Sequence, residues 1–255
     1  MALDPTAALV ILAVSAFAPP LLFLGFVRRT ERYGREPLGR VLRTFLWGAI
    51  FAVILAFLLS FVVYSLYQEV DRVYVFSGRL PNLETVVLAL LIAPFTEELA
   101  KGVGVYLARP IIDEPEDGIV YGAASGFGFA ASENLLYGMA ALLAPGGTIE
   151  LSLLVIGVRS VSSALLHASA TAAFGYGIAA QRVWPDRFRA FPYYLLAVAM
   201  HSTYNLLASL GEFERSVFGE NAALIGLVGA IALAFIAFGA IRAKLRQADA
   251  QRVTW

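Results

Sequence analysis

Two adjacent glutamates and a lysine lie inside an otherwise apolar run, LLIAPFTEELAKGVGV, at residues 90–105. In a helix, Glu97 and Lys101 are four residues apart and share one face, whereas Glu98 points about 100° away. Two neighbouring carboxylates in a poorly solvated site cannot both ionise easily, so one of them can act as a general base toward water. Pro94 lies one turn before Glu97 and is expected to free a backbone carbonyl beside this group.

Three further apolar segments carry the remaining candidate site residues. They are GFGFAASENLLYG with Glu133 and Asn134, VRSVSSALLHASATAAFGYG with Arg159 and His167, and AMHSTYNLL with His201 and Asn205. The two histidines are the only ones in the chain. Histidine and asparagine on a facing helix can polarise a carbonyl and stabilise an oxyanion. Alternatively, His167 and His201 with one or two of the glutamates form a plausible zinc site with an open position for water, and Glu133 is the glutamate expected to complete it. Both routes predict hydrolysis of an amide bond.

These polar groups also have structural interpretations. Ionisable side chains in hydrocarbon are costly, so they face the interior of a bundle and often mark function. Glu97 and Lys101 could instead form an intrahelical ion pair, and a single histidine in a membrane helix is often a packing residue. Glu133 and Arg159 fall at similar depths on consecutive antiparallel segments, so a buried structural ion pair is an alternative to a catalytic Glu133.

The composition indicates a membrane protein. Of the 255 residues 59% are hydrophobic and 15% are charged, whereas soluble domains have about 45–50% apolar and about 25% charged residues. The net charge is zero, which gives no indication of a nucleic-acid partner. The chain has no cysteine, which excludes disulfides, thiolate metal ligands and a cysteine nucleophile.

The elements that must position the polar residues are membrane-spanning helices of about 20 residues each. The sequence predicts an all-α fold, a polytopic membrane helix bundle with seven transmembrane helices in one domain, 1–255. The expected spans are residues 6–27, 44–67, 84–108, 118–143, 150–180, 191–210 and 221–241. The first is expected to be retained, because it lacks the basic start of a signal peptide. The fifth is too long to cross upright, and residues 68–82 could form a short strand or an interfacial element.

Arginine and lysine predict the orientation. Segment 28–43 is rich in arginine, segment 181–189 holds three arginines, and the tail after residue 241 is basic. With seven spans these segments fall on one side, while the other side has only Arg72, Arg79 and Arg215. The positive-inside rule then places the N-terminus outside and the C-terminus in the cytoplasm.

Four motifs in order resemble the PrsW family of intramembrane proteases, which is similar to the wider CAAX-protease and bacteriocin-processing clan. EELAK at 97–101 matches E-E-x-x-K, FAASENLLY at 129–137 matches F-x-x-x-E-N-x-x-Y, HASATAAFG at 167–175 is the third motif, and HSTYN at 201–205 reads H-x-x-x-N. The resemblance covers residues 84–210, which would be the catalytic core.

This resemblance implies a multi-pass endopeptidase of a prokaryotic plasma membrane. It implies a single-span membrane protein as substrate, such as an anti-sigma factor cut at its first site outside the cytoplasm. Glu97 would activate water, with Glu98 as its partner and Lys101 balancing charge. His201 and Asn205 would bind the oxyanion, and Glu133 stands where the clan usually has a histidine. Members are called metalloproteases, yet a glutamate mechanism without metal has also been proposed for them.

Two other functions use the same residues. Chains of glutamate and histidine relay protons, so a proton-coupled transporter or channel is the main alternative, although the sequence shows no inverted repeat. A membrane scaffold or sensor without catalysis is the second. Loss of cleavage on replacing Glu97 would distinguish the protease from both.

Overall fold

In the computed structural model every regular element is a helix within the residues it describes, which are 4–31, 34–75, 78, 82–184, 189–213 and 219–252. The α-helices are α1 (Pro5–Thr30), α2 (Leu38–Leu46), α3 (Val53–Tyr74), α4 (Leu83–Val87), α5 (Ala93–Ala108), α6 (Asp117–Leu143), α7 (Ile149–Val161), α8 (Ser163–Val183), α9 (Ala190–Ala208), α10 (Leu210–Phe213) and α12 (Ala222–Arg252). The π-helices are η1 (Trp47–Ala52) and η2 (Leu88–Ile92), and the 3-10 helices are η3 (Arg109–Ile111) and η4 (Gly219–Asn221). The predicted all-α class is confirmed.

The chain is a multi-pass membrane protein. Four stretches are long and apolar enough to cross a membrane: Pro5–Thr30, Leu38–Tyr74, Ile149–Val183 and Gly219–Ala248. The other three expected spans coincide with α4 to α5, with α6 and with α9, whose sequences are more polar because they carry the candidate site residues. The number of seven spans and their orientation therefore stay predictions.

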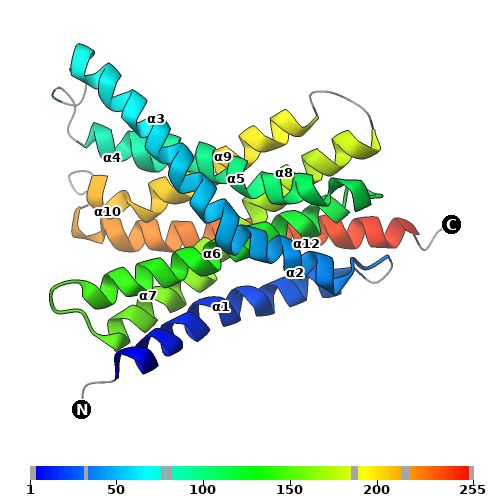
Figure 1. Cartoon of the computed structure of the whole chain (residues 1–255), viewed down its shortest axis with the longest axis horizontal. Helices are drawn as coiled ribbons and strands as arrows, with labels where there is room; N and C mark the ends of the chain where they lie inside the picture. Colours follow the sequence, from blue (N-terminus) through cyan, green and yellow to red (C-terminus); the bar gives the residue numbers. More distant parts are fainter. Residues whose placement is uncertain are drawn as a thin grey trace.

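The ends of the helices gather at two ends of the molecule (Figure 1). The start of α1, the connection between α6 and α7, and the short helices α4 and α10 lie at one end. The C-terminal end of α1, the start of α2 and the end of α12 lie at the other. The arginine-rich segment 28–43 and the basic tail thus share one end of the bundle, as the predicted topology requires.

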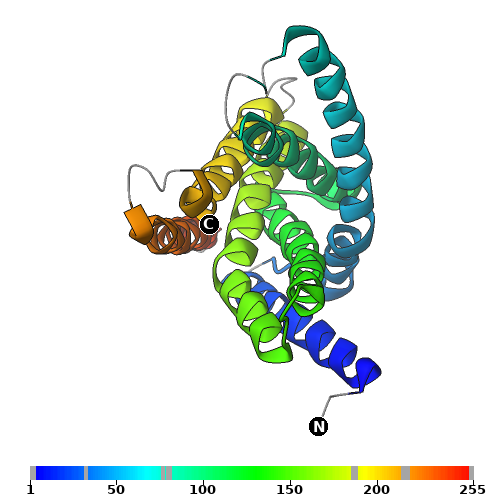
Figure 2. The same cartoon turned by 90° about the vertical axis from the view of Figure 1, so that its left-hand side faces the viewer.

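The centre of the bundle is the pair α6 and α8, with α1, α3 and α12 around it (Figures 1 and 2). Glycines on α6 let the two backbones approach closely. A Cβ atom would lie 2.4 Å from the Thr171 carbonyl oxygen at Gly122, and 2.4 Å from the His167 carbonyl oxygen at Gly126. No larger residue fits either position unless α8 shifts, so these glycines serve close helix packing.

The expected fifth span is broken at Ser162. Residues 149–183 would measure about 52 Å as one straight helix, far more than the ~30 Å hydrocarbon core. The backbone of Ser162 leaves helical geometry, with φ −121° and ψ −79°, and its hydroxyl donates to the Val158 carbonyl at 2.8 Å. Tyr204 of α9 in turn donates to the Ser162 hydroxyl at 3.0 Å. The break separates α7 from α8 just before the segment that carries His167.

α3 is peripheral, because Ala56 is its only buried residue. The helix crosses the bundle and leaves it toward its C-terminal end (Figure 1). Residues 68–74 extend α3, so the alternative of a short strand is wrong for this part, and Val75 ends the helix with φ 54°. Residues 76, 77 and 79–81 of the same prediction lie outside the described residues.

Candidate active site

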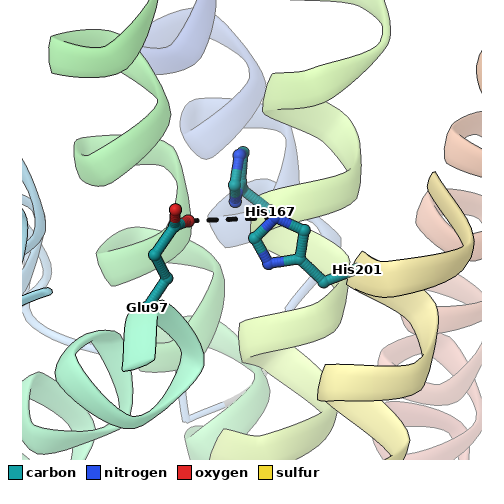
Figure 3. A group of neighbouring side chains, drawn as sticks. All are labelled: Glu97, His167 and His201. Atoms are coloured by element: carbon teal, nitrogen blue, oxygen red, sulfur yellow. Dashed lines mark ion pairs between the residues drawn. The ribbon is translucent and has the colours of Figure 1, made fainter. Parts of the chain in front are cut away.

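Four helices bring the ionisable side chains of the predicted site into one cluster. α5 supplies Glu97, Glu98 and Lys101, α6 supplies Glu133, α8 supplies His167 and α9 supplies His201. Figure 3 shows Glu97, His167 and His201 directed toward one another from three of these helices. Glu98, Lys101 and both histidines are buried, whereas Glu97 and Glu133 keep side-chain exposures of 16% and 21%. The cluster, called the pocket below, therefore combines four buried side chains with two partly exposed carboxylates.

Glu98 and Lys101 form the fully buried floor of the pocket. Lys101 Nζ lies 2.6 Å from Glu98 Oε1 and 3.6 Å from Glu97 Oε2. The other Glu98 oxygen accepts a hydrogen bond from Thr171 Oγ1 of α8 at 2.8 Å. A buried ion pair is tolerated when its remaining valences are satisfied, and Glu98 meets that condition. Its side chain is held rigidly, so it is suited to orient neighbours.

The hydrogen bonds of the two histidines fix which ring nitrogen carries a proton. His201 Nδ1 lies 3.0 Å from Glu98 Oε1, and a carboxylate oxygen only accepts, so Nδ1 donates. In the neutral ring the lone pair is then on His201 Nε2, which lies 3.8 Å from Glu97 Oε2. His167 Nδ1 lies 2.8 Å from Lys101 Nζ, and an ammonium only donates, so His167 Nδ1 accepts. The neutral His167 ring then carries its hydrogen on Nε2, 2.8 Å from Glu133 Oε2.

Arg159 closes the other side of the pocket. Its Nη2 lies 2.7 Å from Glu133 Oε2, as the structural alternative predicts for these two residues. The same guanidinium donates to Asn134 Oδ1 at 3.1 Å and to Ser163 Oγ at 3.0 Å. Asn134 thus contacts the cluster through Arg159. The alternative of a structural pair and a role at the site are compatible here, because Glu133 also contacts His167.

Two carboxylate oxygens in the pocket lack a hydrogen-bond donor among the described residues, namely Glu97 Oε2 and Glu133 Oε2. Cations and imidazoles lie near both atoms, but none with hydrogen-bond geometry. A buried acceptor without a donor is costly and usually marks a site for water or a ligand. The pocket therefore offers two acceptor oxygens to a water molecule or a polar ligand.

Asn205 lies at the edge of this cluster and has a different partner. Pro94 has no N–H, so the carbonyls of Leu90 and Ala89 lose the donor that α-helical and π-helical bonding would give them. Ser202 Oγ donates to the Leu90 carbonyl at 2.8 Å, and Asn205 Nδ2 donates to the Ala89 carbonyl at 2.8 Å. Ser202 and Asn205, one turn apart on α9, thus bind the carbonyls that Pro94 leaves free near Glu97.

The donor set of the pocket also fits a divalent metal. Ligand atoms of Glu97, His167 and His201 all lie within 4.8 Å of one another, and Glu97 Oε2 lacks a donor. Glutamate oxygen and histidine nitrogen are ordinary zinc ligands. This group differs from the expected set in one member, because Glu97 takes the place of Glu133. Glu133 Oε2 instead lies against the guanidinium of Arg159. To bind a metal, His167 would have to present a lone pair, either by giving up its Nε2 hydrogen or by losing the contact of Nδ1 with Lys101.

Some partners in the pocket were not singled out from the sequence as site residues. Thr171 and Ser163 each lie four residues from His167 on the same helical face. Their hydrogen bonds to Glu98 and Arg159 follow from that spacing, which was the available signal. The bond from Ser202 to Leu90 had no such signal, because it joins two helices far apart in sequence.

Comparison with known proteins gives a consistent result. A family model described as PrsW family intramembrane metalloprotease matches residues 36–240. The chain is similar to Protease PrsW of Geobacillus kaustophilus (strain HTA426), with 34% identity over 197 residues, 74% of this chain and 76% of that protein. It is similar to Protease PrsW of Bacillus subtilis (strain 168), with 34% identity over 127 residues, 48% of this chain and 51% of that protein.

A third relative is Protease PrsW of Clostridioides difficile (strain 630), with 28% identity over 196 residues, 72% of this chain and 71% of that protein. No solved structure matches the chain. These relatives are all named as proteases, and the matches give no support to a transporter or channel.

Proposed function

This chain belongs to the PrsW family of intramembrane metalloproteases and is a protease, and from that premise we propose that it hydrolyses a peptide bond of a membrane-anchored protein with water activated by Glu97. The observation that carries the proposal is the donor-free Glu97 Oε2 in a pocket shared with His201 and Glu133. A water hydrogen-bonded to this oxygen would lie beside the imidazole of His201. The side chain of Glu97 is 16% exposed, although its Oε2 atom is itself buried in the pocket.

The reaction divides between the residues as follows. Glu97 takes a proton from water, and the water oxygen adds to the carbonyl carbon of the substrate. The positive charges of Lys101 and Arg159 lie beside the pocket and favour the negative charge that develops on the carbonyl oxygen. The proton then passes to the amide nitrogen, the C–N bond breaks, and the products are a carboxylic acid and an amine.

We assign this proton transfer to His201. Its Nε2 faces Glu97 Oε2 at 3.8 Å, and its Nδ1–H is held by Glu98. A carboxylate that binds one side of an imidazole orients the ring and stabilises its protonated form. Glu98 therefore acts as a positioning residue. Lys101 keeps Glu98 in place and contacts His167 Nδ1, while His167 Nε2 lies 2.8 Å from Glu133 Oε2.

Asn205 receives a different role from the oxyanion role that the resemblance implies. We propose that Asn205 and Ser202 are positioning residues that hold η2, because their side chains bind the two carbonyls left free by Pro94. The segment η2 leads directly into α5, so its position sets that of Glu97. Asn134, in the same sense, positions Arg159.

Zinc is the metal that we expect if the purified protein holds one, bound by Glu97, His167 and His201. When bound there it would act as a Lewis acid toward water and the substrate carbonyl. A ligand role and a base role fall on the same Glu97 oxygen, so metal content decides between them.

For the substrate we propose a single-span membrane protein such as an anti-sigma factor, and for the location the plasma membrane of a prokaryote. The bacterial relatives and the intramembrane family support both proposals. The catalytic core would lie within residues 84–210, in one transmembrane domain.

The test is cleavage of a tagged single-span substrate by the purified chain in proteoliposomes. Glu97→Gln should lower the rate at least about a hundredfold, because it removes the general base. Glu150→Gln, an exposed carboxylate at the start of α7, is the matched control and should cleave at the wild-type rate. Wild-type cleavage by Glu97→Gln would contradict the proposal, provided that both variants unfold at the same temperature as the wild type.

A further inference from the structure

A second hollow lies on the other side of α5, away from the pocket. It has a volume of about 270 Å³ and is walled by α5 and α8. Along α5 it follows Leu99, Val103 and Tyr106, and along α8 it follows Phe174 and Ile178. The rim residues Leu99 and Tyr106 are 45% and 57% exposed, so the hollow opens to the outside of the bundle as a groove. None of the reactions proposed above uses it.

The walls of the groove are apolar, and its polar groups are at one end. Arg109 and Gln181 both line that end. Arg109 stacks on the ring of Tyr106 at 5.6 Å and has no carboxylate partner in the described part of the chain. Gln181 accepts a hydrogen bond from the backbone N–H of Ala190 at 3.1 Å, which leaves its amide NH2 group to donate. This end can therefore bind an anion.

The dimensions match one leaflet of a bilayer. Arg109 and Leu99 are ten residues apart, or about 15 Å along a helix, which is half of the ~30 Å hydrocarbon core. Exposed aromatic rings, Tyr106 and Trp184, lie at the Arg109 end. Tyrosine and tryptophan are typical of the level of lipid headgroups. Arg109 therefore lies at the level expected for the lipid headgroups, and Leu99 at the level expected for the middle of the bilayer.

We propose that this groove, lined by α5 and α8 with Arg109 at its end, binds an anionic phospholipid. The phosphate would lie between Arg109 and Gln181, and one acyl chain would follow the apolar walls toward Leu99. Basic sites between transmembrane helices bind such headgroups in other membrane proteins. A transmembrane substrate helix fits less well, because a volume of about 270 Å³ is too small for a helix about 10 Å wide.

The bound lipid would brace the helices that carry the active site. The floor of the groove is Gly102 against Phe174, where a Cβ on Gly102 would lie 2.2 Å from the Phe174 ring. Gly102 follows Lys101, and Phe174 is one turn after Thr171, which binds Glu98. Filling the groove would press α5 and α8 together next to these contacts, so cleavage should rise in membranes that contain the anionic lipid.

The experiment measures phospholipid retention, which does not depend on proteolysis. The full-length chain is delipidated in detergent, titrated with phosphatidylglycerol or phosphatidylcholine, and examined by native mass spectrometry. We expect one phosphatidylglycerol to bind more tightly than phosphatidylcholine, and Arg109→Gln to weaken phosphatidylglycerol about fivefold. Val103→Phe, which fills the groove, should weaken both lipids. Arg182→Gln is the matched control, because Arg182 is exposed at the same end but does not line the groove.

Three results would overturn the proposal. Arg109→Gln and Val103→Phe could retain phosphatidylglycerol like the wild type, or both lipids could bind equally to the wild type. Val103→Phe could also raise the KM for substrate in lipid-free detergent while lipid retention stays unchanged, which would make the groove a substrate site. Arg109 is half-buried at the start of η3, outside the core of the bundle, so its variant is expected to fold even if Val103→Phe does not.

Discussion

Arg159 joins Glu133, Asn134 and Ser163 through one guanidinium group, which also lies 3.8 Å above the ring of Tyr137. An arginine in this position can hold a carboxylate in one orientation by two kinds of contact, charge and planar stacking. A lysine would keep the charge and lose the stacking and the fork of donors. The side chain is therefore better described as a positioning residue for Glu133 than as an isolated ion pair.

We predict that Arg159→Met lowers cleavage at least about tenfold, because Glu133 loses its partner and the approach of His167 is no longer fixed. Arg159→Lys should retain a larger part of the rate. In a double-mutant cycle with Glu133→Gln, the free energies of unfolding should be non-additive by about 0.5–3 kcal/mol. Equal losses of activity in the Met and Lys variants, with additive stabilities, would reduce Arg159 to a helix-packing residue.

Metal content tests the ligand group at the same scale. If Glu97, His167 and His201 hold zinc, the purified wild type should contain about one equivalent. A His167→Ala/His201→Ala variant should contain little, and Glu133→Gln should keep its metal because Glu133 faces Arg159. Removal of the metal by a chelator should then stop cleavage. A wild type that cleaves without metal would leave Glu97 as the base and exclude the zinc site.

At the scale of elements, the glycines of α6 set the distance to α8. Gly126→Ala places a Cβ against the carbonyl of His167. We expect it to destabilise the fold by about 1–3 kcal/mol, as overpacking does, and to lower cleavage because His167 moves. Gly157→Ala is the control, since a Cβ on Gly157 of α7 meets no atom within 4 Å. A thermal shift for Gly126→Ala no larger than that for Gly157→Ala would contradict the close approach.

The sequence predicted the elements better than their interruptions. Apolar length was enough to predict the helices near each expected span, because burial in lipid leaves few other conformations. The break at Ser162 was not expected, because the surrounding segment 158–167, VRSVSSALLH, has no proline or glycine. It depends on the hydroxyl of Ser162 and on Tyr204 from another helix.

The sequence predicted which residues form the candidate site better than it predicted which of their atoms contact one another. Spacing on one helix placed Glu97 with Lys101 and His167 with Thr171. Which oxygen faces which nitrogen depends on distances between four helices, which sequence spacing does not set. For this reason the metal group contains Glu97 in place of Glu133, and Asn205 binds a carbonyl at the edge of the pocket.

For the whole molecule, the prediction concerns orientation. The chain has no cysteine, so single cysteines report accessibility without background. Ala144→Cys lies exposed between α6 and α7, and Ala250→Cys lies exposed near the end of α12. A membrane-impermeant maleimide should label Ala144→Cys in intact cells and Ala250→Cys only after lysis, because the positive end stays in the cytoplasm. The reverse pattern would show that the N-terminus lies inside.

The pocket between the four helices has an electrical consequence. Glu97, Glu98 and Glu133 oppose only Lys101 and Arg159. With both imidazoles neutral and all three acids ionised, an excess of one negative charge sits in a medium that barely screens it. In the proposed mechanism, Glu97 takes a proton from water and the negative charge moves to the substrate oxygen. The net charge of the pocket and the bound substrate therefore stays the same. This uncompensated negative charge disfavours anions in the pocket and favours a bound cation.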